Sequence, residues 1–120
     1  MNKLTMISVS EEIAGLHYWD CAPKDVEFLK NSHRHMFHII LKIQVKHDDR
    51  EIEFFQLKKW LKGVCSEIFS DTEPVRKSCE MFADDILTKA VIIYGKNRIY
   101  NCEVLEDNEN GAIVNLTPEE

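Results

Sequence analysis

One long stretch of alternating residues constrains the fold of this chain more than any other. From position 34 to 46, apolar residues take nearly every odd position and mostly polar residues take the even ones, as RHMFHIILKIQVK shows. Alternation of period two, rich in branched and aromatic side chains, predicts a long half-buried strand. Residues two apart share a face of a strand, so His33 and His35 are expected to project side by side where it begins. They are candidate zinc ligands, although most isolated His-x-His pairs are solvated or hydrogen-bonded histidines without a metal.

Length and charge narrow the class of protein. The chain has 120 residues, enough for one domain, residues 1–120, with its own core. A net charge of −6 argues against nucleic-acid binding. No apolar run is long enough for a membrane helix and the N-terminus lacks a signal-peptide pattern, so we expect no membrane partner and a cytoplasmic location.

The four cysteines are widely spaced, which excludes a zinc ribbon and favours free thiols. Cys65 and Cys79 fall on the apolar stripes of predicted helices and are expected in the core. Cys21 lies in a polar loop near two candidate ligands and is a candidate reactive thiol.

The order of predicted elements defines the fold class. The first strand, over residues 4–19, is expected to be bent or bulged around a polar Ser10-Glu11-Glu12 and to end near His17. Two amphipathic helices are expected after the long strand, the second capped by Ser78, and then two strands joined by an Asp-Asn-Glu-Asn-Gly turn. The expected ranges are 34–47 for the long strand, 51–69 and 77–91 for the helices, and 98–106 and 112–116 for the last strands. This ββααββ order predicts an α+β fold, an antiparallel four-stranded sheet with two helices on one face.

Several motifs resemble one family of enzymes. His17 lies at the end of the first predicted strand, and His33-Arg34-His35 opens the second. The stretches Glu53-Phe54-Phe55-Gln56-Leu57-Lys58 and Ser78-Cys79-Glu80 begin the two helices, and Glu106 precedes Gly111-Ala112 in the last hairpin. Together they resemble the 6-pyruvoyl-tetrahydropterin synthase and 6-carboxytetrahydropterin synthase family, over nearly the whole chain.

The resemblance implies a T-fold that holds Zn²⁺ with His17, His33 and His35. It implies a homo-oligomer, with a hexamer as the expected form, and a small-molecule substrate that is a reduced pterin of the dihydroneopterin type. Glu106 would accept hydrogen bonds from the ring N–H and exocyclic amine of a pterin or purine-like ligand; without the resemblance, a solvated turn residue among acidic neighbours is the better interpretation. Glu80 would either contact that ligand or only complement the dipole of its helix.

The resemblance leaves the chemistry open, because the family's cysteine before the histidine pair and its Asp-His couple have no counterpart here. Glu27 could replace the cysteine as the catalytic base, as in a subgroup that uses Glu, and Cys21 is the alternative catalytic group. One hypothesis is therefore a zinc-dependent pterin synthase or lyase that cleaves a carbon–oxygen or carbon–carbon bond. The second is a catalytically degenerate zinc protein of this fold that binds a pterin, a purine-like ligand or a protein partner. A third is an α+β interaction module with incidental histidines.

Overall fold

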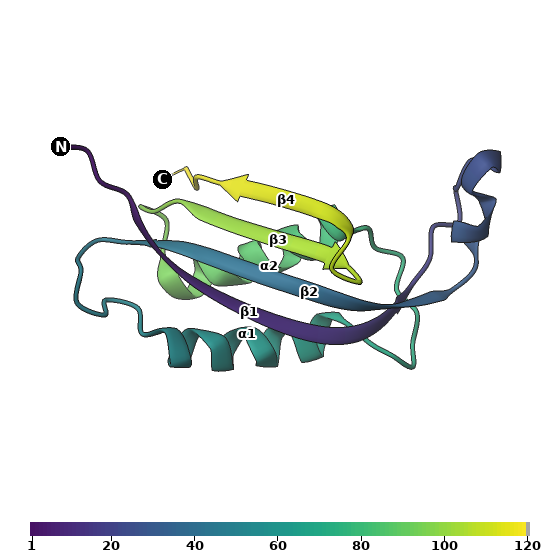
Figure 1. The fold of residues 1–120 in the computed structure, drawn as a ribbon, viewed down its shortest axis with the longest axis horizontal. Coiled ribbons are helices and arrows are strands. Elements are labelled where there is room, and N and C mark those ends of the chain that lie inside the picture. Colours follow the sequence, from purple (N-terminus) through teal and green to yellow (C-terminus); the bar gives the residue numbers. More distant parts are fainter. Residues whose placement is uncertain (120) are drawn as a thin grey trace.

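The computed structural model describes residues 1–119, and its order of strands and α-helices is the predicted one, with a 3₁₀ helix added in the first connection. The elements are β1 (Thr5–His17), a 3₁₀ helix η1 (Lys24–Lys30), β2 (His33–Val45), α1 (Phe54–Ile68), α2 (Cys79–Tyr94), β3 (Tyr100–Glu106) and β4 (Asn110–Leu116). The strands form one antiparallel sheet in the order β1-β2-β3-β4, and the helices pack on it (Figure 1). This confirms the α+β, T-fold-like prediction.

The two longest strands, β1 and β2, pair along their whole length. The register runs without interruption from Thr5 opposite Val45 to His17 opposite His33. The register therefore excludes a bulge in the first strand, which instead curves along its length beside β2 (Figure 1). β1 is an edge strand, so the exposed side chains of Ser10 and Glu12 can stay in the ladder while they face solvent.

Both helices begin at side-chain caps and bury one face. Glu53 accepts hydrogen bonds from the backbone N–H groups of Phe55 and Gln56 at the start of α1. The predicted cap Ser78 accepts from Met81 N–H at the start of α2, which confirms it. α1 packs against β1, whereas α2 packs against β3 and β4. The start of α2 is thereby fixed beside the end of β3.

The core lies between the helices and the sheet face that carries the odd-numbered residues of β2. Phe37 and Ile39 of that strand are fully buried, as are Leu61 of α1 and Phe82 of α2. Cys65 and Cys79 are buried here, as expected, and so is Cys102. The even-numbered residues of β2 lie on the opposite face, which neither helix covers.

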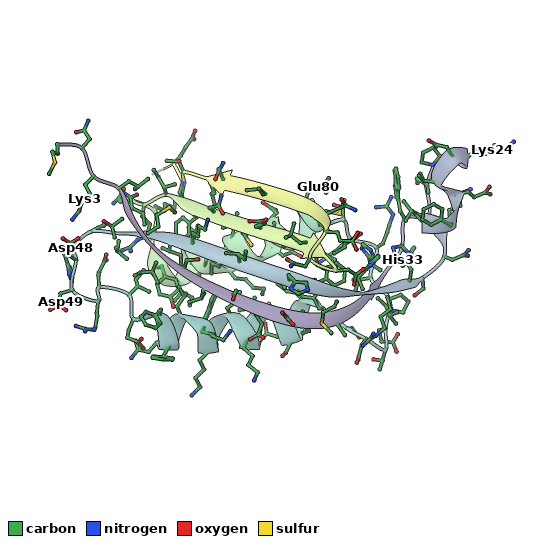
Figure 2. All side chains as sticks on the ribbon, in the orientation of Figure 1. Lys3, Lys24, His33, Asp48, Asp49 and Glu80 are labelled. Atoms are coloured by element: carbon green, nitrogen blue, oxygen red, sulfur yellow. The ribbon has the colours of Figure 1, made fainter. Side chains whose placement is uncertain are left out.

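The connection between β1 and β2, residues 18–32, projects beyond the sheet as an arm that carries η1 (Figure 1). In Figure 2, Lys24 lies far out on this arm and His33 lies at its base. A hydrogen bond of 2.8 Å from Trp19 N–H to the Leu29 carbonyl closes the base, and no residue of η1 is buried. Among the described residues no helix is long and apolar enough to cross a membrane.

Candidate metal centre

Three histidines meet at the end of the sheet from which the arm leaves. His17 is the last residue of β1 and pairs with His33, the first residue of β2, while His35 follows two residues later on the same face. One candidate ligand atom from each histidine lies within 4.8 Å of the others. His17 is buried, and His33 and His35 are partly buried. The three histidines singled out in the sequence therefore form one cluster that could hold a metal ion.

Each imidazole of the cluster is held through its Nδ1 atom by an oxygen. His17 Nδ1 lies 2.8 Å from the Lys77 carbonyl and His33 Nδ1 lies 2.8 Å from the Asn31 carbonyl. His35 Nδ1 lies 2.7 Å from Oδ2 of Asp107. Carbonyl and carboxylate oxygens only accept hydrogen bonds, so all three Nδ1 atoms carry the proton. In the neutral form of each ring, Nε2 is then the nitrogen with the free lone pair, the form that binds a metal.

Asp107 is the member of the site that the sequence did not reveal. It follows β3 in the tight turn to β4 and has a φ of 54°. Its Oδ1 accepts the Met36 N–H at 2.9 Å, and its own N–H donates to the Met36 carbonyl at 2.8 Å. The sequence showed only an acidic turn there, because the contact of Asp107 with His35 depends on how β3 aligns with β2.

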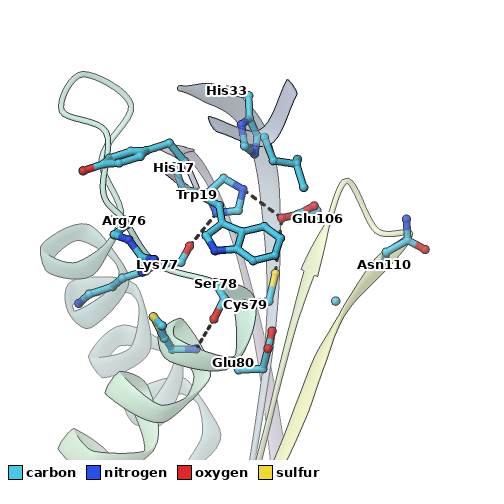
Figure 3. Close-up of a pocket in the computed structure, with 14 residues that line it drawn as sticks. His17, Trp19, His33, Arg76, Lys77, Ser78, Cys79, Glu80, Glu106 and Asn110 are labelled. Atoms are coloured by element: carbon cyan, nitrogen blue, oxygen red, sulfur yellow. Dashed lines mark hydrogen bonds and ion pairs between the residues drawn. The ribbon is translucent and has the colours of Figure 1, made fainter. Parts of the chain in front are cut away.

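Glu106 lies at the centre of the site rather than at its margin. Its Oε2 is 3.0 Å from His17 Nε2 and 3.7 Å from the Cys79 thiol (Figure 3). Its Oε1 is 3.5 Å from His35 Nε2. The contact with His17 holds the pKa of the Glu106 carboxyl below its ordinary range, against the opposing effect of burial. The carboxylate is therefore ionised at neutral pH.

His17 carries an orphaned polar atom. Its Nε2 is buried and has no hydrogen-bond partner of acceptable geometry among the described residues, although Glu106 is close. Burial disfavours its imidazolium, but Glu106 and the Lys77 carbonyl outweigh that effect and raise the pKa of His17. Buried polar atoms are normally satisfied, so a cation at Nε2 would resolve the exception. Three neutral imidazoles with a further position open fit a catalytic type of zinc site.

A cavity of about 460 Å³ opens beside the cluster. Its walls come from the end of β1, the base of the arm, the start of α2 and the β3–β4 turn (Figure 3). The lining side chains that could bind a ligand or take part in a reaction are His17, His33, Trp19, Cys79, Glu80 and Glu106. The two carboxylates predicted to contact a ligand thus face the same cavity as two of the histidines. Glu80 lies in the first turn of α2, so both roles considered for it stay open.

The two predicted catalytic residues, Glu27 and Cys21, lie elsewhere. Neither lines the cavity within the described part of the chain. Glu27 is on η1, mostly exposed and 3.8 Å from Lys30, and Cys21 is exposed in the arm. The assignment of catalysis to either residue stays a prediction that the geometry of this chain does not support.

Comparisons with known proteins do not place the chain in a family. A scan against protein-family models gave no match, and no curated protein matches the sequence. Any conclusion about function therefore depends on the geometry of the site.

Proposed function

We propose that this chain is a zinc-dependent protein that binds a reduced pterin of the dihydroneopterin type beside the metal and acts on it as a lyase or synthase. The observation that carries the proposal is the set of three Nδ1 hydrogen bonds to His17, His33 and His35. Those bonds fix three imidazoles in the ligand tautomer within 4.8 Å of one another. Three histidines without a common role would not be expected to share this hydrogen-bonded Nδ1 arrangement.

Zinc is the metal that this donor set favours. Imidazole suits zinc, copper, iron and nickel, and a cluster of three histidines with an open position is a common catalytic zinc site. When bound, zinc would polarise a substrate hydroxyl or carbonyl. The chain's own part is to hold the three rings, exclude bulk water from the buried His17 and offer carboxylates to the substrate.

The cavity beside the cluster supports a flat, nitrogen-rich ligand. Its volume of about 460 Å³ is in the range of small-molecule sites. Glu80 and Glu106 are acceptors for ring N–H and amine groups, and the indole of Trp19 offers a surface for stacking. A heterocycle with a donor edge, such as a pterin or a purine, satisfies all three side chains.

Proton transfer needs a group within hydrogen-bond reach of the substrate. Glu106 meets this condition best, because it lines the cavity and contacts His17 and His35. Glu27 would reach the cavity only if the arm folded over it. Glu106 is therefore the stronger candidate for the base in this proposal.

A second candidate function is binding without turnover. The exposed positions of Glu27 and Cys21, away from the cavity, favour it. In that case the protein would keep the metal and the heterocycle as ligands only. Product formation from a dihydroneopterin substrate separates the two candidates.

The test begins with metal analysis of the purified protein by mass spectrometry, with one zinc per chain expected. His35→Ala should lose the metal, whereas His38→Ala, a histidine on the uncovered sheet face beside Glu12, should keep it. Dihydroneopterin triphosphate is then incubated with each variant and products are separated by chromatography. Turnover that survives loss of the metal would refute the zinc-dependent reaction, and zinc with pterin binding but no turnover would favour the second candidate.

We also propose that copies of the chain assemble into a homo-oligomer. The helices leave one face of the sheet uncovered, and that face carries Met36 and Ile113, the latter 61% exposed. Both β1 and β4 are edge strands of the sheet, although the Leu16 end of β1 is bonded to the α1–α2 connection. Sedimentation velocity should show a species several times the 14.0 kDa mass of the chain, and a monomer would contradict the proposal.

A further inference from the structure

We propose that Glu106 is the fourth ligand of the bound metal in the resting protein, and that an incoming ligand displaces its carboxylate. The inference rests on the metal site of the proposed function but not on the identity of the substrate. It gives Glu106 a role besides contact with the heterocycle.

Sheet register places Glu106 beside the histidines. Glu106 pairs with Phe37 across β2 and β3, and paired residues project to the same face. His35 lies two residues before Phe37 and shares that face. Glu106 and His35 are thus fixed as neighbours by the ladder, without help from a flexible loop.

The distances suit a shared cation. In a tetrahedral zinc site, ligand atoms about 2.0–2.2 Å from the metal are roughly 3.3 Å from one another. Glu106 Oε2 is 3.0 Å from His17 Nε2, and its Oε1 is 3.5 Å from His35 Nε2. One carboxylate therefore already stands at the spacing of a fellow ligand from two of the three imidazoles.

The orientation of the two rings also suits a cation between them and the carboxylate. Nδ1 of His17 and Nδ1 of His35 each lie beside another oxygen, so Nε2 is the nitrogen that each ring directs at Glu106. A proton on His17 Nε2 would have to point at Glu106, yet that contact does not meet hydrogen-bond geometry. A metal ion needs no such alignment and fits the arrangement better.

The Glu106 carboxylate can leave the metal when a stronger ligand enters the cavity. Apart from the two histidines, its only polar side-chain contact within residues 1–119 is the Cys79 thiol at 3.7 Å, a weak donor. No lysine or arginine among the described residues holds it. A ligand that enters the cavity could thus draw Glu106 away and free a metal position.

The test uses the cobalt(II)-substituted protein, whose visible absorption reports the metal ligands. An intramolecular carboxylate competes at an effective concentration on the order of millimolar or more. Azide should therefore bind the wild-type cobalt protein roughly tenfold or more weakly than Glu106→Ala. The control Glu103→Gln, on the uncovered face of β3, should match the wild type.

Metal affinity gives a readout that is independent of azide. Glu106→Gln keeps the shape of the side chain but should lower zinc affinity roughly 10- to 100-fold, as measured by competition with a chelator. Neopterin added to the wild-type cobalt protein should shift its spectrum toward that of Glu106→Ala. No spectral shift at concentrations where neopterin quenches Trp19 fluorescence would overturn the displacement step.

The failures of the two proposals are distinguishable. If the protein takes up no zinc or cobalt, the metal site and this inference both fail. If metal binds and His35→Ala abolishes it, but azide binds the wild type as tightly as Glu106→Ala, only the fourth ligand is overturned.

Discussion

Asp107 fixes the imidazole of His35 through the Nδ1 atom of the ring. Its Oδ2 accepts the His35 Nδ1–H at 2.7 Å, while its Oδ1 accepts the Met36 N–H at 2.9 Å. One carboxylate thus orients a candidate metal ligand and joins the β3–β4 turn to the start of β2. The left-handed backbone of Asp107 allows this reach.

Asp107→Asn should weaken zinc binding roughly 10- to 100-fold, because the amide accepts less strongly than the carboxylate and no longer fixes His35. Asn tolerates positive φ, so the turn itself should survive. Glu109→Gln, a neutralised neighbour in the same turn, is the matched control. Chelator competition measures both, and equal affinities would show that Asp107 does not position His35.

Gly15 marks a tight contact directly beneath the cluster. A Cβ at this position would lie 3.0 Å from Cε2 of the fully buried Phe37. Gly15→Ala should therefore destabilise the protein by about 1–3 kcal/mol through overpacking. At Gly63, inside α1, an added Cβ meets nothing within 4 Å, and Gly63→Ala should stabilise by about 0.5–1 kcal/mol. Chemical denaturation should give shifts of opposite sign, and a neutral Gly15→Ala would contradict the packing argument.

The stability of the metal-free protein should depend on pH through His17 and Glu106. The pKa of His17 is raised from 6.5. Protonated His17 therefore adds its full stabilisation of the folded state below that value, and this stabilisation is lost as pH rises through the folded-state pKa. The pKa of Glu106 is lowered from 4.5, so its contribution exists above that value and is lost as pH falls through the folded-state pKa. Denaturant midpoints should therefore be highest between these limits, on the acid side of neutrality. Glu106→Gln should flatten the profile, and an unchanged profile would contradict the pairing.

Bound metal should instead stabilise the protein more as pH rises through the pKa of His17. Zinc competes with the proton for His17 Nε2, so its affinity should fall as pH drops through the raised pKa of His17. Isothermal titration in buffers of different ionisation enthalpy should show proton release on binding, increasing toward acid pH. A release that does not change with pH would place the metal elsewhere.

The thiols should divide into one reactive and three protected groups. Burial raises the pKa of Cys65, Cys79 and Cys102 to about 12, so they stay protonated at pH 8. Cys21 is exposed. Ellman's reagent should label one thiol in the native protein and four after denaturation, and Cys21→Ser should remove the native reaction. Labelling of two or more thiols in the native protein would contradict the burial of Cys65, Cys79 and Cys102.

The sequence was sufficient for what depends on local periodicity. The alternation of β2 placed His33 and His35 on one face, and the helical stripes placed Cys65 and Cys79 in the core. His17 joined the pair only because antiparallel pairing brings the end of β1 to the start of β2. That prediction needed the resemblance to a known family as well as the pattern.

What the sequence could not supply depends on register and on the course of the arm. Asp107 reaches His35 only because β3 pairs with β2 in one particular register, which no local pattern reveals. Cys21 and Glu27 were close to the histidines along the chain, but the arm carries both away from the cavity. The bulge considered for β1 did not occur, because a strand at the sheet edge tolerates polar residues.

The pairing of His17 with His33 has a consequence for how the chain unfolds. These residues form the last rung of the β1–β2 ladder, and residues 18–32 leave and return there. A metal joined to both would act as a reversible cross-link that keeps this loop closed and reduces the conformational entropy of the unfolded chain. In a chain without disulfides among its described residues, the metal would thus govern which end of the sheet opens first.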